Sequence, residues 1–138
     1  MYEYGMRVVR VVDGDTVVGL IDLGLHVYVS RNIRLLFYNA PELTMAHAKT
    51  KEEAALGVEA KELLKKLLPE GTLVTINTQL DKDDKYGRVL GELWIGGEFG
   101  ERTNINLEMK SKTDVMWQTL AEAHPDVYKN PVVIGSKI

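Results

Sequence analysis

The hydrophobic period changes once along the chain, and this change constrains the fold more than any other feature. Residues 5–36 are rich in β-branched and aromatic residues, with turn-forming sequences at 13–15 and 22–24. Such a pattern predicts three strands joined by hairpins. Residues 50–68 instead carry leucine and alanine at steps of three and four, with lysine and glutamate between them. This second pattern predicts one amphipathic helix, which ends at Pro69-Glu70-Gly71.

The strands on either side of this helix can be placed from the turn residues. We expect the third strand from Leu25 to Phe37, with His26 inside it. Two more strands are expected over residues 72–78 and 88–95, because Gly96-Gly97 closes the second of these runs. The chain therefore contributes three strands before the helix and two after it.

The C-terminal region is expected to be helical. We predict one short helix over residues 104–109 and another over 115–123, with Thr113 or Asp114 as the N-cap of the second. Trp117 is expected to lie in the core. Together with the strand order, this predicts an α+β, mainly β protein: a five-stranded OB-fold barrel with an inserted amphipathic helix and C-terminal helices. A small α+β sandwich fits the pattern nearly as well.

Composition excludes several classes of protein. At 138 residues the chain has the length of one domain, so we assign 1–138 to a single domain. It has no cysteine, which excludes a disulfide scaffold, a cysteine nucleophile and a thiolate metal site. It contains no apolar run long enough to span a membrane and no apolar leader after Met1, so we expect a cytoplasmic protein without membrane contact. The alternative is a processed secreted form.

The charge balance limits how nucleic acid could be bound. Seventeen Lys and Arg residues stand against twenty Asp and Glu residues, for a net charge of -3. A broad basic footprint for duplex nucleic acid is therefore absent. If the protein handles nucleic acid, a few local arginines must bind it.

The first motif with chemical potential is Asp13-Gly14-Asp15-Thr16, which lies at a junction between two expected strands. Two carboxylates one residue apart can both reach one hard cation. The alternative is an ordinary hairpin turn, because Asp and Gly favour turns for backbone reasons.

The second motif runs from Ile33 to Glu42. Arg34 lies at the end of an apolar strand, where a guanidinium is costly to bury unless it meets an anion. Glu42 follows eight residues later, beside a proline that stiffens the loop. The alternative is an Arg34–Glu42 ion pair that only braces the loop. Tyr38, between them, is a candidate for stacking on a nucleic-acid base.

The third motif is Asp83-Asp84-Lys85-Tyr86-Gly87-Arg88, in the loop before the last expected strand. A guanidinium and an ammonium near one phosphate are suited to anion recognition. Tyr86 is a second candidate for base stacking. The alternative is a solvated polar loop.

These motifs together resemble the staphylococcal nuclease-like (thermonuclease) family. The resemblance rests on Val12 to Val17, on Arg34-Leu35-Leu36 running to Pro41-Glu42, and on Asp84 to Arg88. The sequence Gly57-Val58-Glu59-Ala60 is also similar to the family's helix. The resemblance covers about residues 6–109 and leaves 110–138 as a divergent C-terminal extension.

The resemblance implies an OB-fold nuclease that uses Ca²⁺ to hydrolyse DNA or RNA. It implies two arginines that stabilise the transition state and a glutamate that orients or deprotonates water. Carried over by position, the catalytic residues are Arg34, Glu42 and Arg88. The metal ligands are Asp15, Asn39 and the carbonyl of Ala40, and the residues that contact the substrate phosphate are Lys85 and Tyr86.

Asn39 departs from the family, which has an aspartate at this position. An amide oxygen still ligates Ca²⁺, but one charge is lost and binding should weaken. Asn39 also keeps open a non-catalytic nucleic-acid-binding or protein-interaction module on the same fold. The low charge favours a single-stranded substrate, and we expect a monomer. His47 is expected to be an ordinary loop histidine, with a smaller chance of approaching the site.

Overall fold

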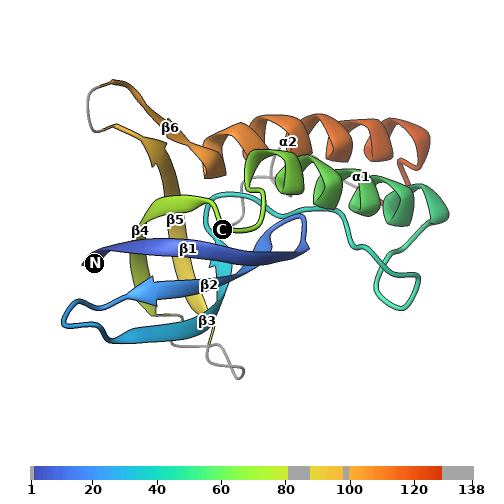
Figure 1. Ribbon diagram of the computed structural model, residues 1–138. Coiled ribbons are helices and arrows are strands. Elements are labelled where there is room, and N and C mark those ends of the chain that lie inside the picture. The colour runs from blue at the N-terminus through green and yellow to red at the C-terminus, as the bar shows by residue number, and fades with distance from the viewer. Residues whose placement is uncertain (1, 81–87, 98–99, 129–138) are drawn as a thin grey trace.

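The computed structural model describes residues 2–80, 88–97 and 100–128. Its strands form one closed barrel (Figure 1). The sheet order is β3-β2-β1-β4-β5-β6, and a parallel pairing of β3 with β5 closes it. The strands are β1 (Tyr2–Asp13), β2 (Thr16–Asp22), β3 (Tyr28–Leu35), β4 (Leu73–Leu80), β5 (Val89–Gly96) and β6 (Arg102–Asn104). Strands β1 to β5 build the barrel, so the expected five-stranded OB-fold is confirmed, and the short β6 only extends its edge.

The core lies inside the barrel and continues under the two helices. Val17, Ile33, Leu35 and other apolar side chains of the strands are fully or almost fully buried. Ala60 and Leu64 of α1 (Lys51–Leu67) join them, because these residues form the apolar face that the leucine spacing predicted. Figure 1 shows α1 and α2 (Ile105–Ala123) side by side on one side of the barrel.

The predicted first helix is confirmed almost to the residue. Thr50 is its N-cap and accepts a hydrogen bond from the backbone N–H of Glu53 at 3.1 Å. Acidic side chains occupy its first turn and basic ones its last, which matches the helix dipole. Neither helix of the described part of the chain is long and apolar enough to cross a membrane.

The prediction of two short C-terminal helices is wrong, because residues 105–123 form the single helix α2 with Asn104 as its N-cap. Thr113, expected as an N-cap, is buried in mid-helix, and its hydroxyl donates to the Met109 carbonyl at 2.9 Å. The polar run after Met109 continues the helix, with Ser111 and Lys112 exposed and Thr113 buried. Lys110 and Asp114, one helical turn apart, form an ion pair of 2.7 Å there.

The third strand is shorter than predicted. It begins at Tyr28 instead of Leu25, and His26 lies in the hairpin loop rather than in a strand. Gly24, Leu25 and His26 all have φ between 56° and 81°, which is left-handed backbone and ends the pairing of β2 with β3. The Leu25 side chain is 95% exposed, so hydrophobicity was a misleading guide at this turn.

Asn106, at the start of α2, joins the helix to the barrel and to the loop that follows β3. Its amide group donates to the carbonyls of Leu36 and Gly91, and its oxygen accepts from the N–H of Leu93. The residue is fully buried. Asn106 therefore holds Leu36, the first residue of the loop after β3, in place.

Candidate active site

One cleft of about 690 Å³ contains every predicted catalytic and metal-binding residue. It lies between the β1–β2 turn, the end of β3, the loop 36–50 and the start of β5. The predicted residues that line it are Asp15, Arg34, Asn39, Ala40, Glu42 and Arg88. Lys85 and Tyr86 lie outside the described residues. Asp15 and Arg88 are far apart in sequence, and the pairing of β3 with β5 that closes the barrel brings them to one cleft.

 

Arg34 pairs with Leu90 in the parallel β3–β5 ladder, so Arg34 lies beside the start of β5, which Arg88 directly precedes.

The β1–β2 turn forms one wall of the cleft. The Asp13 carboxylate accepts from the backbone N–H of Asp15 at 3.0 Å, so the hairpin interpretation of this motif is correct for Asp13. Gly14 is required here, because a Cβ on it would lie 2.6 Å from the Cβ of Ala40 and 2.8 Å from that of Ala60. The turn therefore packs directly on the loop and on α1, which fixes the direction of Asp15.

Tyr38 is not available for stacking on a base, so that interpretation is wrong. Its side chain is fully buried, and its hydroxyl donates to the Gly14 carbonyl at 2.7 Å. Burial, with the nearby Asp15 carboxylate, raises the pKa of the hydroxyl well above its usual value, so it remains a donor. Tyr38 connects the β1–β2 turn to the loop after β3.

Arg34 is buried, and protein oxygens surround its guanidinium. Nη1 donates to the Leu35 carbonyl at 2.7 Å, while Nη2 donates to the Tyr38 carbonyl at 3.1 Å and to the Asn39 side-chain oxygen. Nη2 also lies 3.4 Å from the Asp15 carboxylate. Among the residues that the structure describes, the ion pair of Arg34 is with Asp15, and the predicted alternative of a brace to Glu42 is not observed.

The Asp15 carboxylate is largely buried and accepts hydrogen bonds from two donors. The N–H of Ala40 donates to Oδ2 at 2.8 Å, and the Thr16 hydroxyl donates to Oδ1 at 3.1 Å. Burial raises the pKa of Asp15 to about 7, even though the Arg34 guanidinium acts in the opposite direction. The charge of Arg34 therefore does not offset the effect of burial on the Asp15 pKa.

The oxygen atoms near Asp15 fit a hard cation by type, although not by charge. The described residues include no group of three or more His, Asp and Glu side chains that could hold a metal ion. Asp15 and Asn39 instead offer one carboxylate and one amide oxygen, both of which contact Nη2 of Arg34. With the carbonyl of Ala40, this is an all-oxygen set of the kind that Ca²⁺ prefers.

Glu42 presents its side chain to the cleft from the middle of the loop. The residue is exposed, and its backbone N–H donates to the Glu53 carboxylate at 3.0 Å. Arg88 is half-buried where β5 begins and lines the same cleft. His47 also lines it, which bears out the less favoured of the two interpretations of this histidine.

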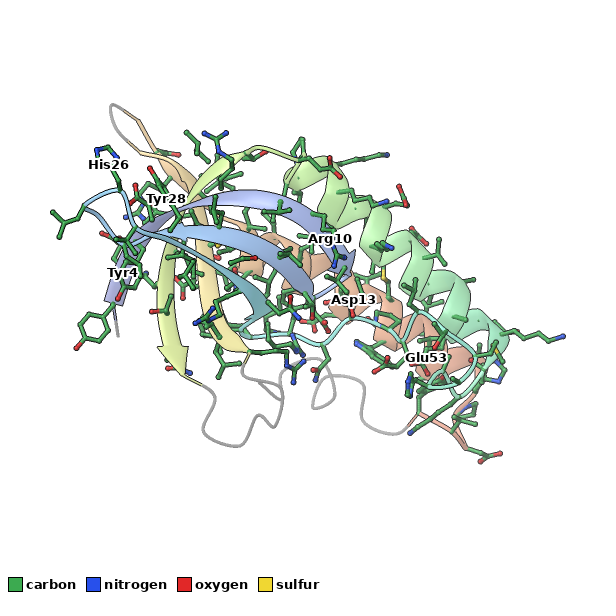
Figure 2. All side chains as sticks on the ribbon, turned by 60° about the horizontal axis from the view of Figure 1, so that its bottom comes forward. Tyr4, Arg10, Asp13, His26, Tyr28 and Glu53 are labelled. Carbon is green, nitrogen blue, oxygen red and sulfur yellow. The ribbon has the colours of Figure 1, made fainter. Side chains whose placement is uncertain are left out.

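Among the residues of the cleft that sequence reasoning missed are Glu53 and Tyr128, and it predicted Trp117 only as a core residue. Trp117 is buried as expected, but its indole N–H donates to the Asn39 carbonyl at 2.7 Å. The spacing of Thr50 and Glu53 is that of a helix capping box, which could have drawn attention to Glu53. Figure 2 shows Asp13 and Glu53 on the cleft side, with Tyr4, His26 and Tyr28 at the other end of the barrel.

Two comparisons with known proteins found related sequences. Residues 32–118 match the family described as staphylococcal nuclease homologue. Over 109 residues, or 78% of the chain, the sequence is 35% identical to "Endonuclease YhcR" of Bacillus subtilis (strain 168). The aligned region is 8% of that protein, so the chain spans less than a tenth of the relative's length. The family match includes all the candidate site residues except Asp15, which precedes it.

Proposed function

Because this chain belongs to the staphylococcal nuclease homologue family, we propose that it hydrolyses phosphodiester bonds of single-stranded DNA or RNA in the cleft beside Asp15. The observation that carries this proposal is the gathering of six candidate residues along one cleft. Two of them are arginines, one is an exposed glutamate, and three offer oxygen ligands. The same set is what phosphodiester hydrolysis needs.

The two arginines would stabilise the charge that develops on the phosphate. Hydrolysis passes through a state with extra negative charge on the phosphate oxygens, and a guanidinium stabilises this state more than the ground state. Arg34 is held in place by its protein acceptors on Nη1 and Nη2. Within the described part of the chain its Nε–H has no acceptor, so this donor is left for the substrate.

Glu42 would orient or deprotonate the attacking water. A carboxylate in this role must reach the cleft and keep access to water, and the Glu42 side chain does both. Its loop is fixed next to Pro41, which is buried. Glu42 thus combines an exposed side chain with an anchored backbone.

Asp15, Asn39 and the Ala40 carbonyl would hold Ca²⁺. Bound there, Ca²⁺ supplies positive charge to the phosphate oxygens. A cation beside Asp15 would also stabilise a carboxylate whose pKa burial has raised to about 7. Only one of the three ligands is charged, so we expect weak binding.

The test is digestion of labelled single- and double-stranded DNA and RNA with Ca²⁺, with Mg²⁺ and with EDTA. We expect cleavage of the single strands in millimolar Ca²⁺ and none in EDTA. Glu42→Gln, which keeps the size of the side chain, serves as the inactive control. Binding without cleavage by the pure wild-type protein would contradict the proposal and favour a non-catalytic binding module.

A further inference from the structure

We propose that Glu53 and Tyr128 are positioning residues for Glu42: they hold the backbone of the loop from which this side chain enters the cleft. The inference rests on the proposed function, in which Glu42 handles the attacking water. Glu53 belongs to the first turn of α1, and Tyr128 follows α2, so neither belongs to the loop. Both line the cleft.

The Glu53 carboxylate is buried and accepts three hydrogen bonds from donors without formal charge. Oε2 accepts from the N–H of Glu42 at 3.0 Å, and Oε1 accepts from the N–H of Lys49 at 3.1 Å. The Tyr128 hydroxyl donates to Oε1 at 2.7 Å. One side chain thus holds two points of the loop, seven residues apart in sequence, against the N-terminus of α1.

The contacts of Tyr128 assign every proton in this network. Burial raises the pKa of its hydroxyl to about 12, so the hydroxyl is protonated at neutral pH and donates to Glu53. Its oxygen lies 2.9 Å from the Thr50 hydroxyl. Because the Tyr128 proton is used on Glu53, Thr50 must be the donor in that contact. Thr50 in turn accepts from the backbone N–H of Glu53, which completes the cap of α1.

The Glu53 carboxylate does not make the usual capping-box contact with the N-cap residue. In a capping box, the glutamate three residues after the cap returns to the backbone N–H of the cap residue itself. Here it reaches Lys49, one residue earlier, and Glu42, on the far side of the loop. A helix that needed only a cap would not require the contact with Glu42.

The opposite side of Glu42 is held just as closely. Gly57 of α1 lies so near that a Cβ on it would be 2.5 Å from the Glu42 carbonyl oxygen. Two residues earlier, Ala40 donates its N–H to Asp15, and before it the Asn39 carbonyl accepts from Trp117. Within residues 39–42, Asn39, Ala40 and Glu42 each have a backbone group bonded to a side chain of another element.

Such anchoring matters because residues 36–50 form no helix or strand. Backbone hydrogen bonds of regular structure cannot hold Glu42 in place, so side chains from the helices must do so. A displacement of about 1 Å at a reacting group is worth roughly a hundredfold in rate. Bonds to a buried carboxylate are the stronger kind and suit this purpose.

Two variants test the proposal, and each has a matched control. Glu53→Gln keeps size but has one oxygen, which best serves Lys49 and Tyr128, and its NH₂ then faces the N–H of Glu42. Tyr128→Phe removes the hydroxyl and keeps the ring, which lies against Trp117 at 5.9 Å between centroids. The controls are Glu52→Gln, one residue earlier with an exposed side chain, and Tyr28→Phe, at the other end of the barrel.

The first measurement is kcat and KM on a single-stranded oligonucleotide at a temperature where all variants are folded. We expect Glu53→Gln to lower kcat about tenfold or more and Tyr128→Phe about threefold, with KM within about twofold. Both controls should match the wild type. If kcat of both variants stays within about twofold of the wild-type value, Glu53 and Tyr128 have no positioning role.

The second measurement is amide hydrogen exchange, which needs neither substrate nor activity. In Glu53→Gln, exchange at Glu42 should accelerate about tenfold or more, while amides in β1 and β2 stay unchanged. Unchanged exchange at Glu42 would overturn the inference. Faster exchange together with a wild-type kcat would also overturn it, because the contact would then be structural only. A wild-type protein that cleaves nothing refutes the proposed function, and the exchange experiment still judges the contacts.

Discussion

Replacing Gly57 with alanine should slow cleavage by displacing Glu42. The added Cβ would lie 2.5 Å from the carbonyl oxygen of Glu42, 2.7 Å from its carbonyl carbon and 2.8 Å from the Cα of Leu43. All three atoms are backbone, so rotation of a side chain cannot relieve the contact. Ordinary contact begins at 3.4 Å, which means that α1 and the loop must separate by about 0.9 Å.

The change in stability should be small, while the change in rate should be large. Overpacking of this kind costs about 1–3 kcal/mol, and the better helix propensity of alanine returns about 1 kcal/mol. The net loss in free energy of unfolding is therefore about 1 kcal/mol. A shift of nearly 1 Å at Glu42 should lower kcat by a factor of roughly 10 to 100.

The assay combines urea unfolding with kcat on a single-stranded oligonucleotide, and Gly5→Ala is the matched control. Gly5 lies in β1, and a Cβ on it would meet nothing within 4 Å. This control should keep the wild-type rate. A Gly57→Ala protein with both wild-type stability and wild-type kcat would refute the reasoning, because it would show that α1 moves away without disturbing Glu42.

Four further substitutions have expected outcomes, three in the cleft and one where α2 joins the barrel. Arg88→Ala should lower kcat about 100-fold or more; Arg34→Ala should do the same and also destabilise the fold by about 3 kcal/mol in urea unfolding, because it leaves the Asp15 carboxylate without its cation. Asn39→Asp should bind Ca²⁺ about fivefold to tenfold more tightly by calorimetry, since a second carboxylate joins Asp15, and equal or weaker affinity would mean that residue 39 is not a ligand. Asn106→Ala should lower the free energy of unfolding by about 3 kcal/mol, because the Leu93 N–H and the Leu36 carbonyl lose their amide partner, while the Gly91 carbonyl keeps only the Leu36 N–H. A loss below about 1 kcal/mol would contradict this.

The expectation for Arg34 shows where the structure changes a sequence-based prediction. From sequence, the resemblance implies that Arg34 is a catalytic arginine, with a loop-bracing ion pair as the alternative. In the structure its side chain is 10% exposed, and it joins Asp15, Asn39 and the Tyr38 carbonyl. The bracing interpretation is therefore right about the role of the side chain in the loop and wrong about Glu42 as its partner.

The parts of the fold that follow from local patterns were predictable. The barrel strands, the turn at Gly14 and the first helix each depend on residues close together in sequence. The long helix α2 was predicted as two short helices, over residues 104–109 and 115–123, with Thr113 or Asp114 as an N-cap between them. The polar run after Met109 also fits one continuous helix, and Lys110 and Asp114 pair there across one turn. Only packing against the barrel decides between the two interpretations.

In the candidate site too, residues in local motifs could be predicted, and roles that depend on the tertiary fold could not. Asp15, Arg34, Glu42 and Arg88 stand in short motifs, so sequence could nominate them, and the barrel brings them to one cleft. Lys85 and Tyr86 stay predictions, because they lie outside the described residues. Tyr38 was misjudged because exposure decides whether a tyrosine stacks on a base or bonds inward, and exposure depends on the tertiary fold.

The loop from residue 36 to 50 explains why the remaining contacts were hidden from sequence. A segment without helix or strand must satisfy its polar backbone groups by other means. Here a side chain of the β1–β2 turn serves Ala40, one of α1 serves Glu42, and one of α2 serves Asn39. Each contact joins residues from different elements, so no local pattern reveals it. It follows that a substitution in α2, far from Glu42 in sequence, can change the rate without touching the substrate.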